Sequence, residues 1–356
     1  MLETIPETAS FVCPTPPRQR DRIVLGHGSG GRLSAELLRD VFLPLFSNPV
    51  LDRMDDQAIV EIGGARVAFT TDSFVVQPLF FPGGDIGSLA VHGTVNDLAM
   101  GGARPLFLSA GFILEEGFSV AALRRISSSM AEAAAAAGVM IVTGDTKVVE
   151  RGKGDGLFIN TTGIGIVPDG VRLSARQARP GDRVILSGAI GDHGIAILCR
   201  REGLEFENEI LSDSAALHNL VGAMLSASTG ANAIRCLRDP TRGGVSSALN
   251  EIAEQSKVSI QIQETCIPVR EEVRGACELL GLDPLYIANE GKLLAIVAPE
   301  AVDQILAAMR RDPLGREAAI IGTVGDESAG MVTLRTAFGS TRIVDMLAGE
   351  QLPRIC

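Results

Sequence analysis

The sequence predicts a two-domain protein of the α/β class with mixed sheets, and three observations support this. The 356 residues suffice for two domains that each bury a core. Strand-like apolar runs alternate with helical stretches along the chain. Residues 167–182 are rich in proline, glycine and charge and lie between two strand-like runs, which is typical of a domain boundary.

This boundary leads us to divide the chain into four segments. We expect a loosely ordered lead-in over 1–20, an N-terminal domain over 21–168, a C-terminal domain over 169–340 and a tail over 341–356. The last nine residues, AGEQLPRIC, lack periodicity and contain a proline, so we expect a flexible tail. Nine extended residues reach roughly 30 Å, enough to enter or leave a site on the body of the protein.

The N-terminal half begins with a predicted hairpin, because β-rich runs at 57–62 and 66–71 flank Gly63-Gly64. A helix is expected from Asp85, a suitable N-cap, to about Gly101. A strand, a helix with one apolar stripe and a buried strand are then expected at 106–114, Ser119–Ala137 and Val139–Val142.

The C-terminal half begins with the strand Val184–Leu186. Its periodicity predicts further helices and strands in alternation. The helices are expected near 213–226, 244–255 and 299–310, and the strands near 258–262, 292–298, 319–324 and 331–335.

Composition excludes several classes of protein. The net charge of −11 disfavours long-range attraction to nucleic acid or anionic membranes. The sequence contains no run of about 18 apolar residues, so a membrane span is not expected. The six cysteines form no CxxC pair, so a disulfide framework or a structural zinc site is not expected, and reduced thiols indicate the cytoplasm.

Two glycine-rich segments are candidate anion sites. GHGSGGR, from Gly26 to Arg32, precedes a helical stretch, and its glycines allow backbone N–H groups to approach a phosphate. A flexible connector explains that loop equally well. RDPTRGG, from Arg238 to Gly244, also precedes a helix, and ordinary N-capping by Asp239 or Thr241 is the alternative there.

Acidic residues recur at the ends of apolar runs or inside an apolar helix. Asp97 is the clearest candidate ligand, because Asn96-Asp97 interrupts an otherwise apolar helix and a buried carboxylate needs a partner. A hard cation with oxygen ligands would supply one, although unrelated turns and caps remain the alternative. The five predicted members of this metal–phosphate set are Asp56, Asp72, Asp97, Asp145 and Asp239.

Cys356 ends the chain. One interpretation is that this residue has no function and lies in an unimportant tail. The other is that its thiol carries an acyl group, and that the mobile tail delivers this group to a site on the same chain, so that the reaction is intramolecular. Lys147 and Glu290 taken alone fit a surface lysine and a hairpin turn. For His27, His92 and His193 a conformational or core role is expected.

Taken together, nine motifs make the chain resemble a known family. They are GHGSGGR, FTTDSFVVQPLFFPGGDIG, VNDLAMGGARP, GFILEEG, VTGDTKVVERG, SGAIGDHGIAIL, RDPTRGGV, ANEGKLL and the terminal PRIC. In this order they resemble the HypE family of hydrogenase maturation factors, the carbamoyl dehydratases, within the aminoimidazole ribonucleotide synthetase superfamily. The resemblance covers about residues 21 to 356 and not residues 1–20.

The resemblance implies a two-domain fold, an activity and a set of partners. The N-terminal domain is expected to bind ATP and to pair with that of a second subunit, forming a homodimer around a β-barrel-like core. HypF is expected to place a carbamoyl group on Cys356. A lyase-type, ATP- and Mg²⁺-dependent step then dehydrates this group to a thiocyanate. The cyanide equivalent would pass through a HypC–HypD complex to a [NiFe]-hydrogenase.

The resemblance also implies residue roles. Asn96 and Thr146 match nucleotide-contacting positions, which add to Gly28, Gly30 and Gly31 of the glycine loop. The five aspartates match the metal ligands. Lys147 and Glu290 match positions beside the modified cysteine. Glu290 is then a candidate proton acceptor, whereas Lys147 either stabilises negative charge on the oxygen or acts as a base.

Two rival functions remain. Selenophosphate synthetase and thiamine-monophosphate kinase share the acidic set, and Cys13 resembles the place of the selenophosphate enzyme's reactive residue. The terminal Cys356 has no role in those enzymes and discriminates against them. The second rival is a non-catalytic assembly factor that binds nucleotide as a shape switch.

Overall fold

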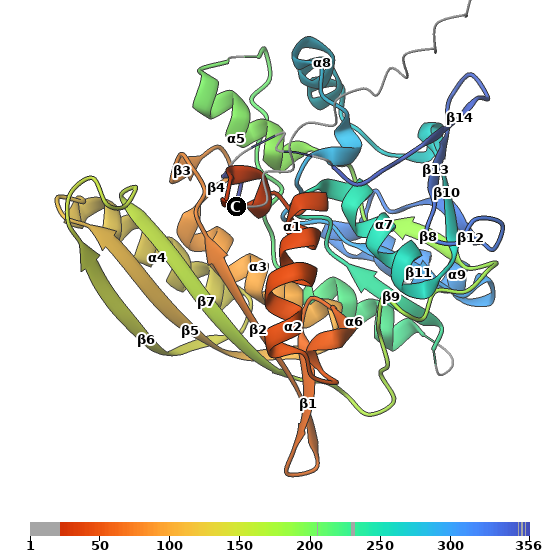
Figure 1. Ribbon diagram of the computed structural model, residues 1–356, viewed down its shortest axis with the longest axis horizontal. Helices are drawn as coiled ribbons and strands as arrows, with labels where there is room; N and C mark the ends of the chain where they lie inside the picture. Colours follow the sequence, from red (N-terminus) through yellow and green to blue (C-terminus); the bar gives the residue numbers. More distant parts are fainter. Residues whose placement is uncertain (1–21, 205, 229–231, 348, 350–351, 353) are drawn as a thin grey trace, which may run out of the picture.

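Two separate β-sheets organise the chain (Figure 1). The computed structural model describes residues 22–204, 206–228, 232–347, 349, 352 and 354–356. The predicted lead-in, residues 1–20, therefore lies outside the described residues, as do residues 348, 350, 351 and 353 of the predicted tail. A stretch without helix or strand, between Ile166 and Arg183, separates the two sheets along the chain. The exact domain limits stay a prediction.

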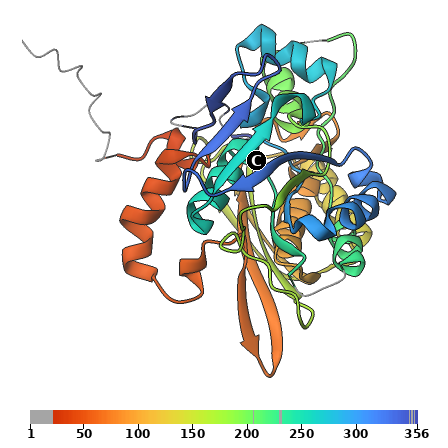
Figure 2. The same ribbon diagram turned by 90° about the vertical axis from the view of Figure 1, so that its right-hand side faces the viewer.

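The first sheet is five-stranded, in the order β1-β2-β7-β5-β6. The predicted hairpin is confirmed, since β1 and β2 pair antiparallel, and this hairpin projects beyond the helices in Figure 2. Only β5 and β6 pair parallel, and they are joined by the helix α4. The strands are β1 (Ala58–Ile62), β2 (Ala65–Phe74), β5 (Arg104–Glu115), β6 (Met140–Val149) and β7 (Leu157–Ile166).

Two helices cover one face of this sheet: α3 (Ile86–Met100) and α4 (Val120–Ala136) (Figure 1). Both were predicted. Asp85 caps α3 as expected, because its carboxylate accepts from the backbone N–H groups of Gly87 and Ser88 at 2.8 and 3.1 Å. Asn96 and Asp97 are thereby fixed on the last turns of a helix that lies against β2 and β7.

The opposite face of the same sheet is exposed and partly apolar. Phe69, Ile164, Phe107 and Met140 are in register across β2, β7, β5 and β6, and they are 45%, 39%, 37% and 60% exposed. The sequence prediction of a buried strand at Val139–Val142 is therefore wrong for Met140, Ile141 and Val142. These residues do form a strand, but it is an exposed edge strand, because no element of the described chain covers it.

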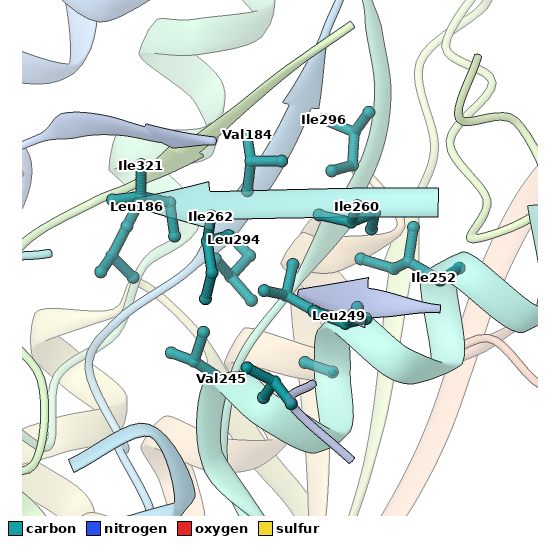
Figure 3. Close-up of a cluster of buried hydrophobic side chains, with 14 of the residues drawn as sticks. Val184, Leu186, Val245, Leu249, Ile252, Ile260, Ile262, Leu294, Ile296 and Ile321 are labelled. Carbon is teal, nitrogen blue, oxygen red and sulfur yellow. The ribbon is translucent and has the colours of Figure 1, made fainter. Parts of the chain in front are cut away.

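The second sheet is seven-stranded, in the order β14-β13-β10-β12-β8-β11-β9. One face packs on α7 (Gly244–Ser256), whose Val245, Leu249 and Ile252 contact the strands (Figure 3). The other face packs on α6 (His218–Ala227) and α9 (Val302–Arg311). The strands are β8 (Arg183–Leu186), β9 (Ile234–Arg238), β10 (Ser259–Gln263), β11 (Leu294–Val297), β12 (Ala319–Gly325), β13 (Val332–Arg335) and β14 (Thr341–Ile343).

The predicted helix near 213–226 starts only at His218. Residues 213–217 form neither helix nor strand, and Asn96 of α3 binds their backbone. The Asn96 amide donates to the carbonyl of Ala215 and accepts from the N–H of Leu217. A tertiary contact therefore overrides the local helical pattern.

Several shorter elements complete the fold. Two helices, α5 (Asp192–Glu202) and α8 (Glu271–Leu280), pack against each other beside the C-terminal sheet. A helical segment at the N-terminus consists of α1 (Arg32–Leu37), the π-helix η2 (Leu38–Phe42) and α2 (Leu43–Phe46) and stands beside the body in Figure 2. The strands β3 (Phe80–Phe81) and β4 (Gly84–Asp85) form a separate pair before α3. Within the described part of the chain, no helix is both long and apolar enough to cross a membrane.

The cap of α3 gives the first prediction. Replacing Asp85 by alanine removes the acceptor for two helix N–H groups and is expected to lower the free energy of unfolding by about 1–2 kcal/mol. Asp85→Asn keeps an acceptor oxygen and should lose less. Urea unfolding of both variants measures this, and equal losses would contradict the capping role.

Candidate functional site

Four of the five predicted aspartates converge where the two sheets meet. Asp56 precedes β1, Asp72 lies in β2, Asp97 in α3, and Asp239 follows β9. Burial raises the pKa of each of these carboxyls, and the electrostatic repulsion of Asp97 by Asp239, Asp72 and Asp56 raises its pKa further. Close carboxylates that repel one another are the chemical signature of a cation site.

Individual contacts hold these carboxylates in place. Asp97 accepts a hydrogen bond from the hydroxyl of Thr70 at 2.8 Å. Arg238 forms an ion pair with Asp56 and a second with Glu251. Neither Asp97 nor Asp239 has an ion pair within the described part of the chain. Burial together with the charge of Asp56 raises the pKa of Asp239 to about 8, and burial and three like charges raise that of Asp97 well above its usual value. These two carboxylates would both gain from a cationic ligand.

The donor set fits a magnesium ion that a nucleotide brings with it. Among the described residues, no three histidine, cysteine or carboxylate side chains converge closely enough to form a complete metal site. Mg²⁺ is usually held by one or two carboxylates plus the phosphates of a substrate, rather than by an all-protein cage. Loosely grouped aspartates are what such a shared site requires.

Glu290 lies buried next to this cluster, with 2% of its surface exposed. Its N–H donates to the carboxylate of Asp213 and its carbonyl accepts from Asn96, so the backbone is fixed on both sides. Its Oε1 atom has no hydrogen-bond partner within the described part of the chain. Burial, reinforced by Asp239 and Asp72, raises the pKa of Glu290 well above its usual value. The side chain is therefore suited to bind and release a proton.

The end of the tail lies inside the body, where Figure 1 marks the C-terminus. Two backbone hydrogen bonds join the tail to residues 75–77: the N–H of Val75 donates to the terminal carboxylate of Cys356 at 2.9 Å, and the N–H of Gln77 donates to the carbonyl of Arg354 at 3.2 Å. Ile355 is 4% exposed in the N-terminal core. The sequence left the resting position of the tail open, and here the tail is docked.

The docked thiol sits among charges from both halves of the chain. Burial raises the pKa of Cys356 to about 12, with Arg242 acting in the opposite direction and Glu290 and Asp72 adding to the rise. The sulfur is therefore a neutral thiol in this position. The same three charged residues surround whatever group the sulfur carries.

Arg242 connects the predicted glycine loop to the site of the docked thiol. The guanidinium donates to the carbonyl of Gly28 at 3.0 Å, and a Cβ on Gly30, whose φ is +72°, would collide with the Arg242 backbone. A Cβ on Gly31 would collide with the carbonyl of Leu347. These glycines thus permit close packing between the loop, the start of α7 and the base of the tail. Phosphate binding by the loop stays a prediction.

Asp145, Thr146 and Lys147 are not brought to this cluster within one protomer. In the register of the first sheet, Asp72 aligns with Gly144, so Asp145 projects from the opposite face of the sheet. Three strand spacings, about 14 Å, separate the two strands. Lys147 and Asp145 are both 69% exposed and form an ion pair with each other at 2.6 Å.

Asn96, a predicted nucleotide contact, is 1% exposed and its amide is fully used. It binds Ala215, Leu217 and Glu290. The side chain positions Glu290, and a direct nucleotide contact stays a prediction that these hydrogen bonds do not support.

The sequence analysis did not assign Arg242 or Asp213 to the site. Arg242 lies within RDPTRGG, and a cation in a candidate anion loop was a usable signal. No sequence signal pointed to Asp213, because it belongs to a segment with helical periodicity. It forms a buried ion pair with Lys292 at 2.9 Å and holds the N–H of Glu290 at 3.0 Å.

Comparison with known proteins identifies the family. Residues 54–167 and 179–335 match the N-terminal and C-terminal domains of AIR synthase related proteins. The chain is 62% identical to carbamoyl dehydratase HypE of Azotobacter vinelandii over 93% of this chain and 96% of that protein. It is 46% identical to HypE of Escherichia coli K12 over 94% and 100% of the two chains.

Solved structures agree with this assignment. HypE in a HypE–HypF complex superposes with a TM-score of 0.83 at 50% identity, over 87% of this chain and 99% of that chain. HypE in complex with ATP superposes with a TM-score of 0.79 at 51% identity, over 94% and 100%. A thiamine monophosphate kinase shares only the fold, at 20% identity and a TM-score of 0.63, over 87% and 99%. With the carboxylate cluster and the docked terminal thiol in place, the chain belongs to the carbamoyl dehydratase HypE family.

Proposed function

We propose that this chain uses ATP to dehydrate a carbamoyl group carried on the sulfur of Cys356, giving a thiocyanate that supplies cyanide ligands for [NiFe]-hydrogenase maturation. One observation carries the proposal: the tail is docked on the body of the protein, where the terminal thiol comes under the electrostatic influence of Arg242, Glu290 and Asp72. A chain that presents its own C-terminal sulfur to a carboxylate–cation site is built to process a group attached there. The chain's relatives include a HypE whose structure was solved with ATP.

The chemistry requires activation because an amide oxygen is a poor leaving group. Transfer of the γ-phosphoryl group of ATP to the carboxamide oxygen, with loss of one N–H proton, gives an O-phosphorylated thioimidate and ADP. Loss of phosphate and of the remaining N–H proton then forms the C≡N bond. The water formally removed ends up in the phosphate, and one ATP is consumed per thiocyanate. Positioning and charge neutralisation dominate such a transfer.

The residues of this protomer suggest a division of labour. Glu290 acts electrostatically on the docked sulfur, and its raised pKa suits the acceptance of an N–H proton. Arg242 is the cation that acts most strongly on the sulfur, and it is placed to offset negative charge that develops on the attached group. Lys147 keeps the two roles that the sequence left open, stabilising charge on the oxygen or acting as a base.

We place Mg²⁺ with the nucleotide phosphates at Asp56, Asp72, Asp97 and Asp239. The bound ion would neutralise phosphate charge and orient the γ-phosphoryl group. In the protomer, Arg238 already compensates Asp56, so Asp97 and Asp239 are the carboxylates left to coordinate most directly.

A homodimer is part of the proposal. The apolar row Phe69, Ile164, Phe107 and Met140 occupies a sheet face that no described element covers. A second copy packed on this face would bury the row and form the barrel-like core. It would also give Asp145 and Lys147, which lie on this face, an active site to serve, namely that of the partner.

HypF and a HypC–HypD complex are the proposed partners for loading and unloading. A HypE relative was solved as a HypE–HypF complex, which supports the first of them. The docked thiol is enclosed and neutral, so Cys356 must leave its site to receive the carbamoyl group. We place the protein in the cytoplasm, because a working terminal thiol needs a reducing compartment. Cys13, the residue that would favour the selenophosphate rival, lies outside the described residues.

Cys356→Ala is expected to abolish the mass increase of the C-terminal peptide after incubation with carbamoyl phosphate, ATP and the transferase partner. It should also abolish the ATP hydrolysis that depends on carbamoylation. Cys266→Ala, a partly exposed thiol outside the site, is the control and should behave like the wild type. An unchanged mass increase in Cys356→Ala would overturn the proposal, and a protein without carbamoylation-dependent hydrolysis would be the non-catalytic rival.

Mixed dimers test the shared site. Asp72→Asn and Asp145→Asn homodimers should each lose most Mg²⁺–ATP-dependent dehydration, because each of their sites has one altered residue. A purified mixed dimer has one unaltered site and should regain about half of the wild-type activity. Asp303→Asn, exposed on α9, is the control. A mixed dimer as inactive as its parents would place both aspartates in the same protomer's site.

The dimer itself is tested by Met140→Glu. A charge at the β6 end of the apolar row is expected to shift the protein to monomers in light scattering, while the unfolding midpoint of the monomer stays near that of the wild type. Lys153→Glu, outside this row, is the matched control and should leave the assembly unchanged. Retention of the dimer in Met140→Glu would exclude this face as the interface.

A further inference from the structure

We propose that His193 is a positioning residue that sets the register of the tail, because it binds the carbonyl directly before Cys356 and connects it to the loop that holds Glu290. No role in the reaction has been derived for this histidine so far. The inference rests on the proposed function in one respect only, that Cys356 carries the reacting group.

His193 is fully buried at the start of α5 and makes two hydrogen bonds. Its Nε2 lies 2.8 Å from the carbonyl oxygen of Ile355, and its Nδ1 lies 2.8 Å from the hydroxyl of Ser212. A carbonyl oxygen only accepts, so Nε2 carries the proton and Nδ1 is the acceptor. The Ser212 oxygen accepts from the N–H of Ser214 at 3.1 Å, which leaves its own proton for Nδ1.

The imidazole is therefore held in one tautomer and in its neutral form. Burial lowers the pKa of His193, in agreement with this assignment. Phe81 packs edge-on against the ring, with 5.6 Å between the ring centroids, and restricts its rotation. The single donor, Nε2–H, is thus fixed on the tail.

The last three residues of the chain are each bound through a backbone oxygen, but not in the same way. The carbonyl of Arg354 accepts from the N–H of Gln77 and from the guanidinium of Arg201, and the terminal carboxylate of Cys356 accepts from the N–H of Val75. The carbonyl of Ile355 accepts from His193. Without that donor, this carbonyl next to the reacting cysteine has no other partner among the described residues, which disfavours docking.

Through Nδ1, His193 is hydrogen-bonded to Ser212, in the loop that holds Glu290. The backbone of Ser212 donates to the carbonyl of Pro82, which ties this loop to the N-terminal half. The next residue, Asp213, accepts from the N–H of Glu290 and from Lys292. One hydrogen-bonded path therefore runs from Ile355 through His193 and Ser212 to the backbone of Glu290.

A matched pair of variants separates the two nitrogens. His193→Gln places an amide nitrogen close to the position of Nε2 and keeps the donor to Ile355. His193→Asn places one close to Nδ1, so it keeps contact with Ser212 and loses the tail. Both are polar and similar in size, so they disturb the core to a similar extent.

The readout is the rate at which iodoacetamide alkylates Cys356 in the whole protein without nucleotide. It is followed by the mass of peptide 351–356 after cleavage at Glu350. His193→Gln should alkylate within about twofold of the wild type, and His193→Asn about 10- to 100-fold faster, the effect of one lost buried hydrogen bond on the docking equilibrium. Equal rates in the two variants would overturn the proposal.

Thermal unfolding distinguishes positioning of the tail from a role in the core. The midpoint of His193→Asn should lie below that of His193→Gln in the full chain, and the two should coincide in a chain that ends at Glu350. A difference that persists without the tail means that His193 serves only the core, and the proposal fails. Because neither measurement needs ATP or a carbamoyl donor, a wild-type chain that forms no thiocyanate would refute the proposed function without deciding on His193.

Discussion

The electrostatic cost of gathering carboxylates in one buried place governs this molecule. Asp56, Asp72, Asp97 and Asp239 raise one another's energy, and Glu290 adds to the repulsion. Of the four aspartates, only Asp56 has a direct ion pair in the described chain, with Arg238. Such a cluster is stable only because the folded core around it contributes more than the repulsion costs. Binding of a cation with its nucleotide relieves that repulsion, so the fold keeps this site ready for its ligand.

The tail separates two chemical steps in space. A thiol accepts a carbamoyl group only as the thiolate, and burial raises the pKa of the docked Cys356 to about 12, which suppresses that form. A thiocarboxamide has no such charge and enters the site without this penalty. The docked position therefore favours the loaded sulfur over the free thiolate. Desolvation alone therefore favours carbamoylation of Cys356 while the tail is undocked and dehydration of the carbamoyl group while the tail is docked.

Local signals predicted local structure well. The β1–β2 hairpin, the Asp85-capped α3 and the apolar stripe of α4 depend on neighbours in sequence, and all three are confirmed. Periodicity failed where a distant residue decides, as at residues 213–217, which lie outside the helix and whose backbone Asn96 binds. The sequence grouped five aspartates from their places at the ends of apolar runs or inside an apolar helix, and four of them influence one another's pKa in the structure, while their role as metal ligands stays a prediction. The roles of Arg242 and Asp213 depend on how the tail and loops fold back, which periodicity does not encode.

Asp145 shows why a motif alone does not place a residue. It lies within a strand, as Asp72 does, yet strand pairing sends it to the opposite face of the sheet. That face also displays the apolar row of Phe69, Ile164, Phe107 and Met140. In a single protomer the exposed apolar row costs free energy in water. The Asp145–Lys147 pair then lies on the face away from the carboxylate cluster. Pairing two copies through this face resolves both at once, which is the strongest physical reason to regard the working unit as a dimer.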